Sequence, residues 1–311
     1  MIQQGALGLA AYWRPTVWDQ AEAVPETDPL AIMRGWAPGA HGAEDTGFAM
    51  QERDLRLLAR LWAAGALMTE HVQALYFPGV RSAVAVRRRM RKLWGVGLVR
   101  RFRPQLSDAH GAGSYLFSLT ELGLAVLHEA RHPWWTTRYP DATWDPRQQE
   151  RPPSFDLLHG LMTADVACWA ESRLGREWVH ESEPAGRIAV YVGGGKGAGE
   201  AFWPDAVLDD RQGGSPAWFL EVERRAYVPH WREKCGKWTA WASQYALGKA
   251  PAVFVVAGYL HDSADRFQRS IVPLLREVPD AIRPLVRVLD LATWDRSSDA
   301  PQIVPLSDVA G

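Results

Sequence analysis

The chain has 311 residues, of which 47% are hydrophobic and 23% charged, and its 35 Lys and Arg against 36 Asp and Glu give a net charge of -1. These proportions are those of an average globular chain, and they exclude wholesale disorder, collagen-like repeats and coiled-coil composition. The length predicts two domains of ordinary size. The longest mostly apolar stretch, residues 251–260, is far shorter than the ~20 residues of a membrane span, and the N-terminus lacks the basic segment of a signal peptide. We therefore expect a cytoplasmic protein that does not bind membranes.

The near-zero net charge is an average over unlike segments. An N-terminal extension, residues 1–46, holds six acidic and two basic residues, whereas residues 47–131 hold thirteen basic and six acidic ones. A Pro- and Trp-rich linker, residues 132–153, is balanced, and residues 154–311 carry a charge of -4. A compact positive segment within a neutral chain is typical of a nucleic-acid-binding domain. We therefore predict a DNA-binding domain over 47–131 and a second domain over 154–311.

The basic residues of the first domain concentrate in one stretch that contains no acidic residue. Like charges three or four positions apart on a helix repel each other by roughly a few tenths of a kcal/mol per pair, so a partner outside the chain is needed to offset the repulsion. Double-stranded DNA is such a partner, although an arginine-rich solvent face produced by coding bias is an alternative. The residues that we predict to bind DNA are Arg81, Arg87, Arg88, Arg89, Arg91, Lys92, Arg100, Arg101 and Arg103.

Helical patterns predict a helix-turn-helix around this stretch. The first helix covers residues 50–62, and a short second helix, 70–77, follows Thr69 as its N-cap. Pro-Gly then breaks the chain, and Ser82 caps a third, basic helix over 83–94. A helix, a short helix, a tight turn and a basic helix are the parts of a helix-turn-helix, which places its last helix in the major groove.

The residues after the basic helix predict a β-hairpin wing. A strand over 98–103 leads to a polar, Gly-containing tip at 107–114, a returning strand at 115–119 and a closing helix at 120–127. The whole unit is therefore predicted to be a winged helix, with the wing arginines on flanking phosphates. A winged helix that serves protein dimerisation is the alternative.

The C-terminal half alternates strands and helices. We expect Trp134, Trp135 and Trp144 of the linker to pack between the domains. The order of elements after the linker predicts an α/β fold, α+β for the whole chain, with a mixed central sheet and flanking helices. The predicted elements are a helix over 155–173, strands over 177–182, 187–192, 202–208 and 217–223, a helix over 230–247, a strand over 252–258, a helix over 263–278 and a strand over 285–291.

Three acidic residues of this half are predicted to lie close together. Side chains alternate along a strand, so Glu221 and Glu223 point to the same face, and Asp205 lies on the neighbouring strand. Like charges at such a distance are costly unless a cation lies among them, and oxygen ligands are those that Mg²⁺ prefers. Lys234 and Lys237 share one face of the following helix. The other interpretations are a turn aspartate at 205 and a solvent-facing acidic row at 221 and 223.

These residues resemble a known fold and a known family. Pro204-Asp205, Glu221-x-Glu223 and a helix with Lys234 look like the PD-(D/E)xK restriction-endonuclease-like fold. With the winged helix in front, the order of parts resembles the replication-relaxation family of actinobacterial plasmids and integrative elements over residues 48–295. The matching segments are Arg53-Asp54-Leu55, Leu75 to Gly79, Leu93 to Val99, Leu119 to Gly123, Phe219 to Glu223 and Arg232-Glu233-Lys234.

The resemblance implies roles for the acidic cluster. Asp205 and Glu221 become metal ligands, with Glu223 in the position of the nuclease lysine, and Lys234 or Lys237 then replaces that lysine from the helix. As catalytic residues we therefore name these five, and as metal ligands the three acids. If neither lysine takes that part, the domain is a nuclease-fold scaffold that no longer cuts.

Three hypotheses follow from the sequence. The first is a DNA-binding protein of a plasmid or mobile element, acting in replication, relaxation or regulation, as a homodimer or with a partner encoded by the same element. The second is a Mg²⁺-dependent DNA endonuclease. The third makes the C-terminal half a protein-interaction domain and the winged helix a dimeriser.

Overall fold

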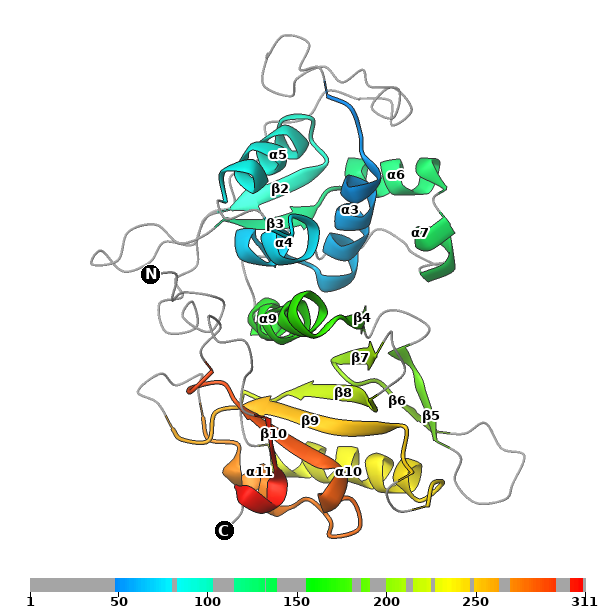
Figure 1. The fold of residues 1–311 in the computed structure, drawn as a ribbon, viewed down its shortest axis with the longest axis vertical. Helices are drawn as coiled ribbons and strands as arrows, with labels where there is room; N and C mark the ends of the chain where they lie inside the picture. The colour runs from blue at the N-terminus through cyan, green and yellow to red at the C-terminus, as the bar shows by residue number, and fades with distance from the viewer. Residues whose placement is uncertain are drawn as a thin grey trace. The chain divides into compact units, whose positions relative to one another are not determined.

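The chain divides into two compact units, residues 1–168 and 169–311. The division falls inside one long helix, α9 (Phe155–Leu174), later than the end of the linker predicted from the sequence. The predicted N-terminal extension, the tip of the predicted wing, Arg81, Ser82, Arg103 and Trp144 lie outside the described residues. The computed structural model, drawn in Figure 1, describes residues 48–79, 83–102, 115–131, 133–138, 155–180, 186–190, 200–210, 215–224, 227–246, 249–262, 269–294 and 303–309.

The N-terminal unit packs helices against a small antiparallel sheet (Figure 1). Before α9 its elements are α3 (Glu52–Ala64), β1 (Leu67–Met68), α4 (Thr69–Tyr76), α5 (Val84–Gly95), β2 (Val99–Phe102), β3 (Leu116–Leu119), α6 (Glu121–Ala130) and α7 (Pro133–Arg138). Helices α3, α4 and α5 lie where the sequence predicts three helices, with ends shifted by one or two residues. Strand β3 lies between β1 and β2 and pairs Val99 with Leu119. Because the tip between β2 and β3 is outside the described residues, the winged helix as a whole stays a prediction.

Two local predictions in this unit are wrong. Thr69 is the first residue of α4 and not its N-cap, because its hydroxyl donates to the carbonyl of Tyr115 at 3.3 Å beside the β1–β3 pair. The predicted linker begins with a short helix, α7, which has Pro133 in its first turn, where the missing N–H costs nothing. Trp135 of this helix was predicted to pack between the domains. Trp135 of α7 is buried against Trp62 of α3, ring edge to ring face at 5.5 Å, so it packs within the N-terminal unit.

Gly123 in the first turn of α6 leaves no room for a side chain. A Cβ there would lie 2.6 Å from Leu119 Cδ1 and closer still to the carbonyl oxygen of Leu98. We expect Gly123→Ala to lower the free energy of unfolding by about 1–3 kcal/mol, the usual cost of overpacking. Gly95→Ala, with nothing within 4 Å of the added Cβ, should stay within about 0.5 kcal/mol of the wild type. Urea unfolding of both variants checks this, and equal stabilities would contradict it.

The C-terminal unit is built on a mixed six-stranded sheet. The strand order is β11-β10-β9-β8-β7-β4, with β8, β9 and β10 parallel to one another and the other pairs antiparallel. This confirms the predicted α/β class. The elements after α9 are β4 (Arg176–His180), β5 (Ile188–Val190), β6 (Glu200–Phe202), β7 (Ala206–Asp210), β8 (Ala217–Val222), α10 (Val228–Ala242), β9 (Ala252–Gly258), α11 (Val272–Arg276), a 3-10 helix (Arg283–Leu285), β10 (Val286–Asp290), β11 (Ile303–Pro305) and a second 3-10 helix (Leu306–Asp308).

The predicted strand over 202–208 is in fact two strands. Strand β6 ends at Phe202 and pairs with β5 in a separate two-stranded sheet, and β7 begins at Ala206 in the main sheet. Pro204 lies between them, and a proline cannot donate a hydrogen bond to a sheet ladder. Asp205 therefore lies just before β7, and its carboxylate accepts a hydrogen bond from the backbone N–H of Val222 at 2.7 Å.

Helix α10 is fixed to the sheet by tryptophans. Trp231, Trp238 and Trp241 are almost fully buried, and the ring of Trp238 stacks on Phe254 of β9 with centroids 4.3 Å apart. Figure 1 shows α10 and α11 on the same side of the sheet. This anchoring decides where the lysines of α10 can reach.

Within the described part of the chain, no helix is long and apolar enough to cross a membrane.

Candidate functional site

Helix α5 turns a row of arginines toward solvent. Its apolar residues Val86, Met90 and Leu93 are completely buried. Arg87, Arg88 and Arg91 are exposed, and we call these three residues the arginine face. Among the described residues, none of their side chains has a hydrogen-bond or ion-pair partner. The arginine face therefore carries three positive charges that the described residues do not neutralise.

Lys92 lies at the margin of this surface. It is half-buried in the last turn of α5, where a positive charge interacts favourably with the helix dipole. The positive charge of Lys92 is therefore partly accounted for by the dipole of its own helix.

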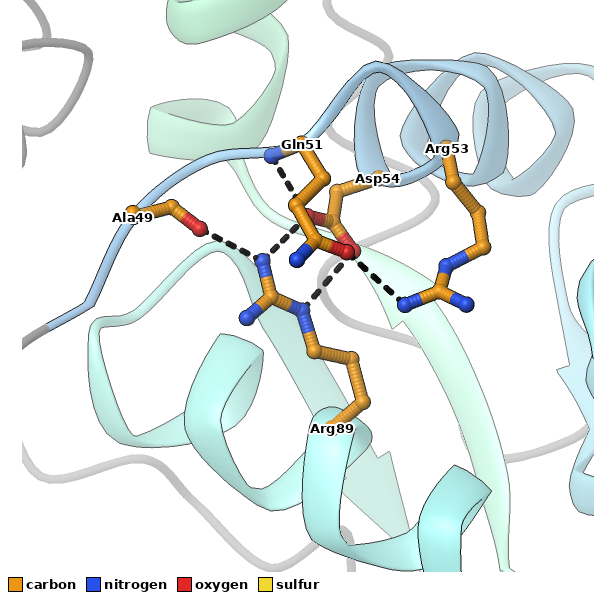
Figure 2. A network of polar contacts seen from close by, with 5 residues as sticks. All are labelled: Ala49, Gln51, Arg53, Asp54 and Arg89. Atoms are coloured by element: carbon orange, nitrogen blue, oxygen red, sulfur yellow. Dashed lines mark hydrogen bonds and ion pairs between the residues drawn. The ribbon is translucent and has the colours of Figure 1, made fainter.

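Arg89 is held inside the unit (Figure 2). Its Nε donates to Asp54 Oδ1 at 2.9 Å, its Nη2 donates to Asp54 Oδ2 and to the carbonyl of Ala49 at 2.8 Å, and its guanidinium lies over the ring of Phe48. Asp54 is only 1% exposed and also accepts from the backbone N–H of Gln51 at 2.8 Å. The two residues join α3 to α5. Arg89 was predicted to bind DNA, but the structure places it in the fold, because a buried carboxylate needs a counter-charge.

The arginines of β2 are half-buried. The guanidinium of Arg101 lies 3.4 Å from the ring centroid of Trp94, a cation–π contact that holds the side chain against α5. Burial lowers the pKa of Arg100. Arg81 and Arg103 lie outside the described residues. Of the nine predicted DNA-binding residues, the arginine face is thus the most accessible described group.

The C-terminal unit brings the three predicted acids to one lysine. Lys234 Nζ donates to Glu221 Oε2 at 2.6 Å and to Glu223 Oε1 at 2.8 Å. Asp205 binds the backbone N–H of Val222, between these two glutamates. Strand alternation places Glu221 and Glu223 on the same side of β8, as predicted from the sequence. We call Asp205, Glu221, Glu223 and Lys234 the carboxylate–lysine cluster.

Burial decides the protonation of the carboxylate–lysine cluster. Glu221 is 1% exposed, so it is not part of a solvent-facing row. Burial raises its pKa from 4.5 to about 8, against the opposing charge of Lys234 and with a further increase from Asp205 and Glu223. Burial also works against the charge of Lys234, but the carboxylates of Glu221, Asp205 and Glu223 outweigh it and raise the pKa of this lysine. The ammonium therefore stays charged at neutral pH.

Lys237 does not join the cluster. It pairs with Glu233 at 2.8 Å, one helical turn back on the surface of α10. The structure thus separates the two lysines that the sequence could not distinguish. Of these two lysines, only Lys234 reaches the carboxylates, because it shares a face of α10 with the buried Trp231 and Trp238, which pack that face against the sheet.

The nuclease-like resemblance implies a Mg²⁺ ion at Asp205, Glu221 and Glu223, and these residues suit such an ion only in part. The oxygen chemistry of the three acids fits a hard cation. Their arrangement does not, because the ammonium of Lys234 lies in contact with Glu221 and Glu223. In the described segments, no group of three or more His, Cys, Asp or Glu side chains is arranged to hold a metal ion.

The raised pKa of Glu221 makes stability depend on pH. Between pH 4.5 and about 8 the folded chain holds a proton that the unfolded chain releases, so the free energy of unfolding falls as pH rises through this window. We expect Glu221→Gln to flatten this fall, which for one proton has a slope of at most about 1.4 kcal/mol per pH unit. Urea unfolding followed by tryptophan fluorescence at intervals of pH measures both slopes. Parallel curves for the variant and the wild type would contradict the assignment.

Sequence reasoning missed a buried pair in the N-terminal unit. His71 Nε2 and Asp165 Oδ1 lie 2.7 Å apart, and both side chains are about 5% exposed or less. The backbone N–H of Met68 donates to His71 Nδ1 at 3.2 Å, so Nε2 carries the proton and donates to Asp165. The sequence signal for this pair was Asp165, an acidic residue within the apolar run that predicts α9. Its partner lies 94 residues away and cannot be found from local periodicity.

Taken together, these observations define an α/β protein with an N-terminal helix-rich unit, an exposed arginine face and a mixed-sheet C-terminal unit. Its sequence matches the replication-relaxation family over residues 56–256, and the chain belongs to that family. The description of that family, replication-relaxation, connects the protein with replication. No curated protein and no solved structure matches the chain.

Proposed function

We propose that the protein binds double-stranded DNA through α5, as the DNA-binding component of a plasmid or mobile element. The observation that carries the proposal is the arginine face. Three arginines project from a helix whose other side is completely buried, and no described residue neutralises them. A rigid helix with a free basic side is suited to the major groove, which admits an α-helix.

The arginine face can make two kinds of contact. Arginines that meet phosphates position the protein and release counterions, whereas arginines that reach a guanine edge read sequence. Arg87, Arg88 and Arg91 lie within about one helical turn of each other, so both kinds of contact are within reach of one groove. The β2–β3 hairpin supports the proposal because it lies beside α5 and carries two further arginines.

The salt dependence of DNA affinity tests this proposal. Fluorescence anisotropy with a labelled duplex should give an affinity that falls steeply as salt increases. Three phosphate contacts correspond to a slope of about -2.7 in log affinity against log salt. An affinity that is the same at low and high salt would refute the proposal. Sedimentation of the free protein and of the complex then shows whether it acts as a homodimer.

The predicted Mg²⁺-dependent endonuclease is the second candidate. The convergence of Asp205, Glu221 and Glu223 supports it, and the position of Lys234 opposes it. Incubation of plasmid and linear DNA with the protein, with and without Mg²⁺ or Mn²⁺, tests it directly. Metal-dependent cleavage that Glu221→Gln abolishes would establish the nuclease, and intact DNA under all conditions would remove it.

A further inference from the structure

In the carboxylate–lysine cluster the positive charge is the ammonium of a lysine, where a nuclease-like site would hold a divalent metal ion. The resemblance to a nuclease-like fold implies a divalent ion held by Asp205 and Glu221. Here Lys234 Nζ lies 2.6 Å from Glu221 Oε2 and 2.8 Å from Glu223 Oε1. Mg²⁺ binds carboxylate oxygens at about 2.0–2.1 Å, so an ion bound to these oxygens would lie close to the ammonium, and the two positive charges would repel each other.

The position of Lys234 is fixed by its helix. Trp231 and Trp238, three residues before and four residues after it, are 1% and 0% exposed and anchor α10 on the sheet. Lys234 itself has 21% of its side chain exposed, so it reaches the cluster from the edge of the core. Moving the ammonium away would leave the acidic cluster without its counter-charge and would remove the hydrogen bonds that Lys234 donates to Glu221 and Glu223, which is unfavourable.

We infer that Lys234 is the built-in counter-ion of this cluster: its ammonium replaces the divalent metal of a nuclease site, so the C-terminal unit is stable without metal and binds a divalent cation at these carboxylates only when the ammonium is removed. This inference is independent of DNA binding by α5. It also accounts for the close approach of three acids, one of them buried, in a unit whose described segments hold no group of metal-binding residues.

Thermal unfolding of the full chain tests the inference, followed by tryptophan fluorescence in EDTA, MgCl₂ or MnCl₂. The wild type should have the same melting temperature in all three, and calorimetric titration with Mn²⁺ should show no binding. Lys234→Met, which keeps the apolar stem, should melt roughly 10 °C lower in EDTA because it leaves the acidic cluster without its counter-charge. Mn²⁺ should restore part of this loss.

Two further variants separate charge from folding defects. Lys237→Met removes a lysine one turn along α10 that pairs only with Glu233 on the surface, so it should melt like the wild type and not respond to metal. The double variant Glu221→Gln with Lys234→Met removes the buried acid together with the ammonium and should melt above Lys234→Met without metal. It also provides a measurement if Lys234→Met alone does not fold.

The opposite results overturn the inference. A wild-type melting temperature that rises with Mn²⁺, and that no longer rises in Glu221→Gln, would show a resident metal site. Equal melting temperatures for Lys234→Met and Lys237→Met would show that the ammonium of Lys234 is not the required counter-ion.

Discussion

Replacing Arg87, Arg88 and Arg91 together by alanine is expected to lower the affinity for duplex DNA by about 100-fold or more. Each arginine that contacts a phosphate or a guanine contributes roughly 1–3 kcal/mol, and 1.4 kcal/mol is a factor of ten. Because none of these side chains has a hydrogen-bond or ion-pair partner among the described residues, the folded structure should not change. The melting temperature of the triple variant should therefore equal that of the wild type.

A matched control removes the same charge elsewhere. Arg269, Arg276 and Arg287 lie on the C-terminal unit, outside the basic segment, and their triple alanine variant changes the net charge equally. If the arginine face binds DNA, only the first triple variant loses affinity. Equal losses in both would mean that affinity follows net charge and not this surface.

Single variants then distinguish the roles within the arginine face. Loss of a phosphate contact weakens binding to all sequences equally and reduces the salt slope by about one. Loss of a base contact changes the preferred sequence at one position. A selection of bound sites from a random duplex library, repeated with each variant, assigns each arginine to one of these roles.

Helical periodicity was sufficient to predict the accessible arginines. A stripe of Val86, Met90 and Leu93 must face the core, so residues on the other side of the helix face solvent. Arg89, which lies beside the stripe, was included among the DNA-binding residues because it belongs to the basic stretch and not because of this periodicity. Its position depends on Asp54, 35 residues earlier in the chain, and no local pattern shows that pairing.

For the carboxylate–lysine cluster too, one part could be predicted from the local sequence and the other depends on tertiary contacts. Strand alternation predicts that Glu221 and Glu223 share a face, and Pro-Asp marks the start of β7. The sequence could not show that Lys234 occupies the space between the glutamates. That depends on the tryptophans that orient α10 and on the parallel register of β8 with β9, which are both tertiary features.

The second large effect is expected from the ion pair in Figure 2. Asp54→Ala removes a buried carboxylate that accepts hydrogen bonds from the backbone of Gln51 and from Arg89, and it leaves the guanidinium of Arg89 with 12% of its side chain exposed and no counter-charge. Breaking a buried pair by removing one partner costs about 3–5 kcal/mol. The free energy of unfolding of the variant, measured in urea, should fall by that amount.

The partner variants show whether Arg89 is a structural residue or a DNA contact. Arg89→Met should destabilise the fold as Asp54→Ala does, and the double variant should cost less than the sum of the two, because the residues share one interaction. At a temperature where Arg89→Met is folded, its salt slope for DNA binding should equal that of the wild type, since a guanidinium held by Asp54 releases no counterions. A slope reduced by about one in Arg89→Met, with unchanged stability, would instead place Arg89 on the DNA and return it to the set predicted from the sequence.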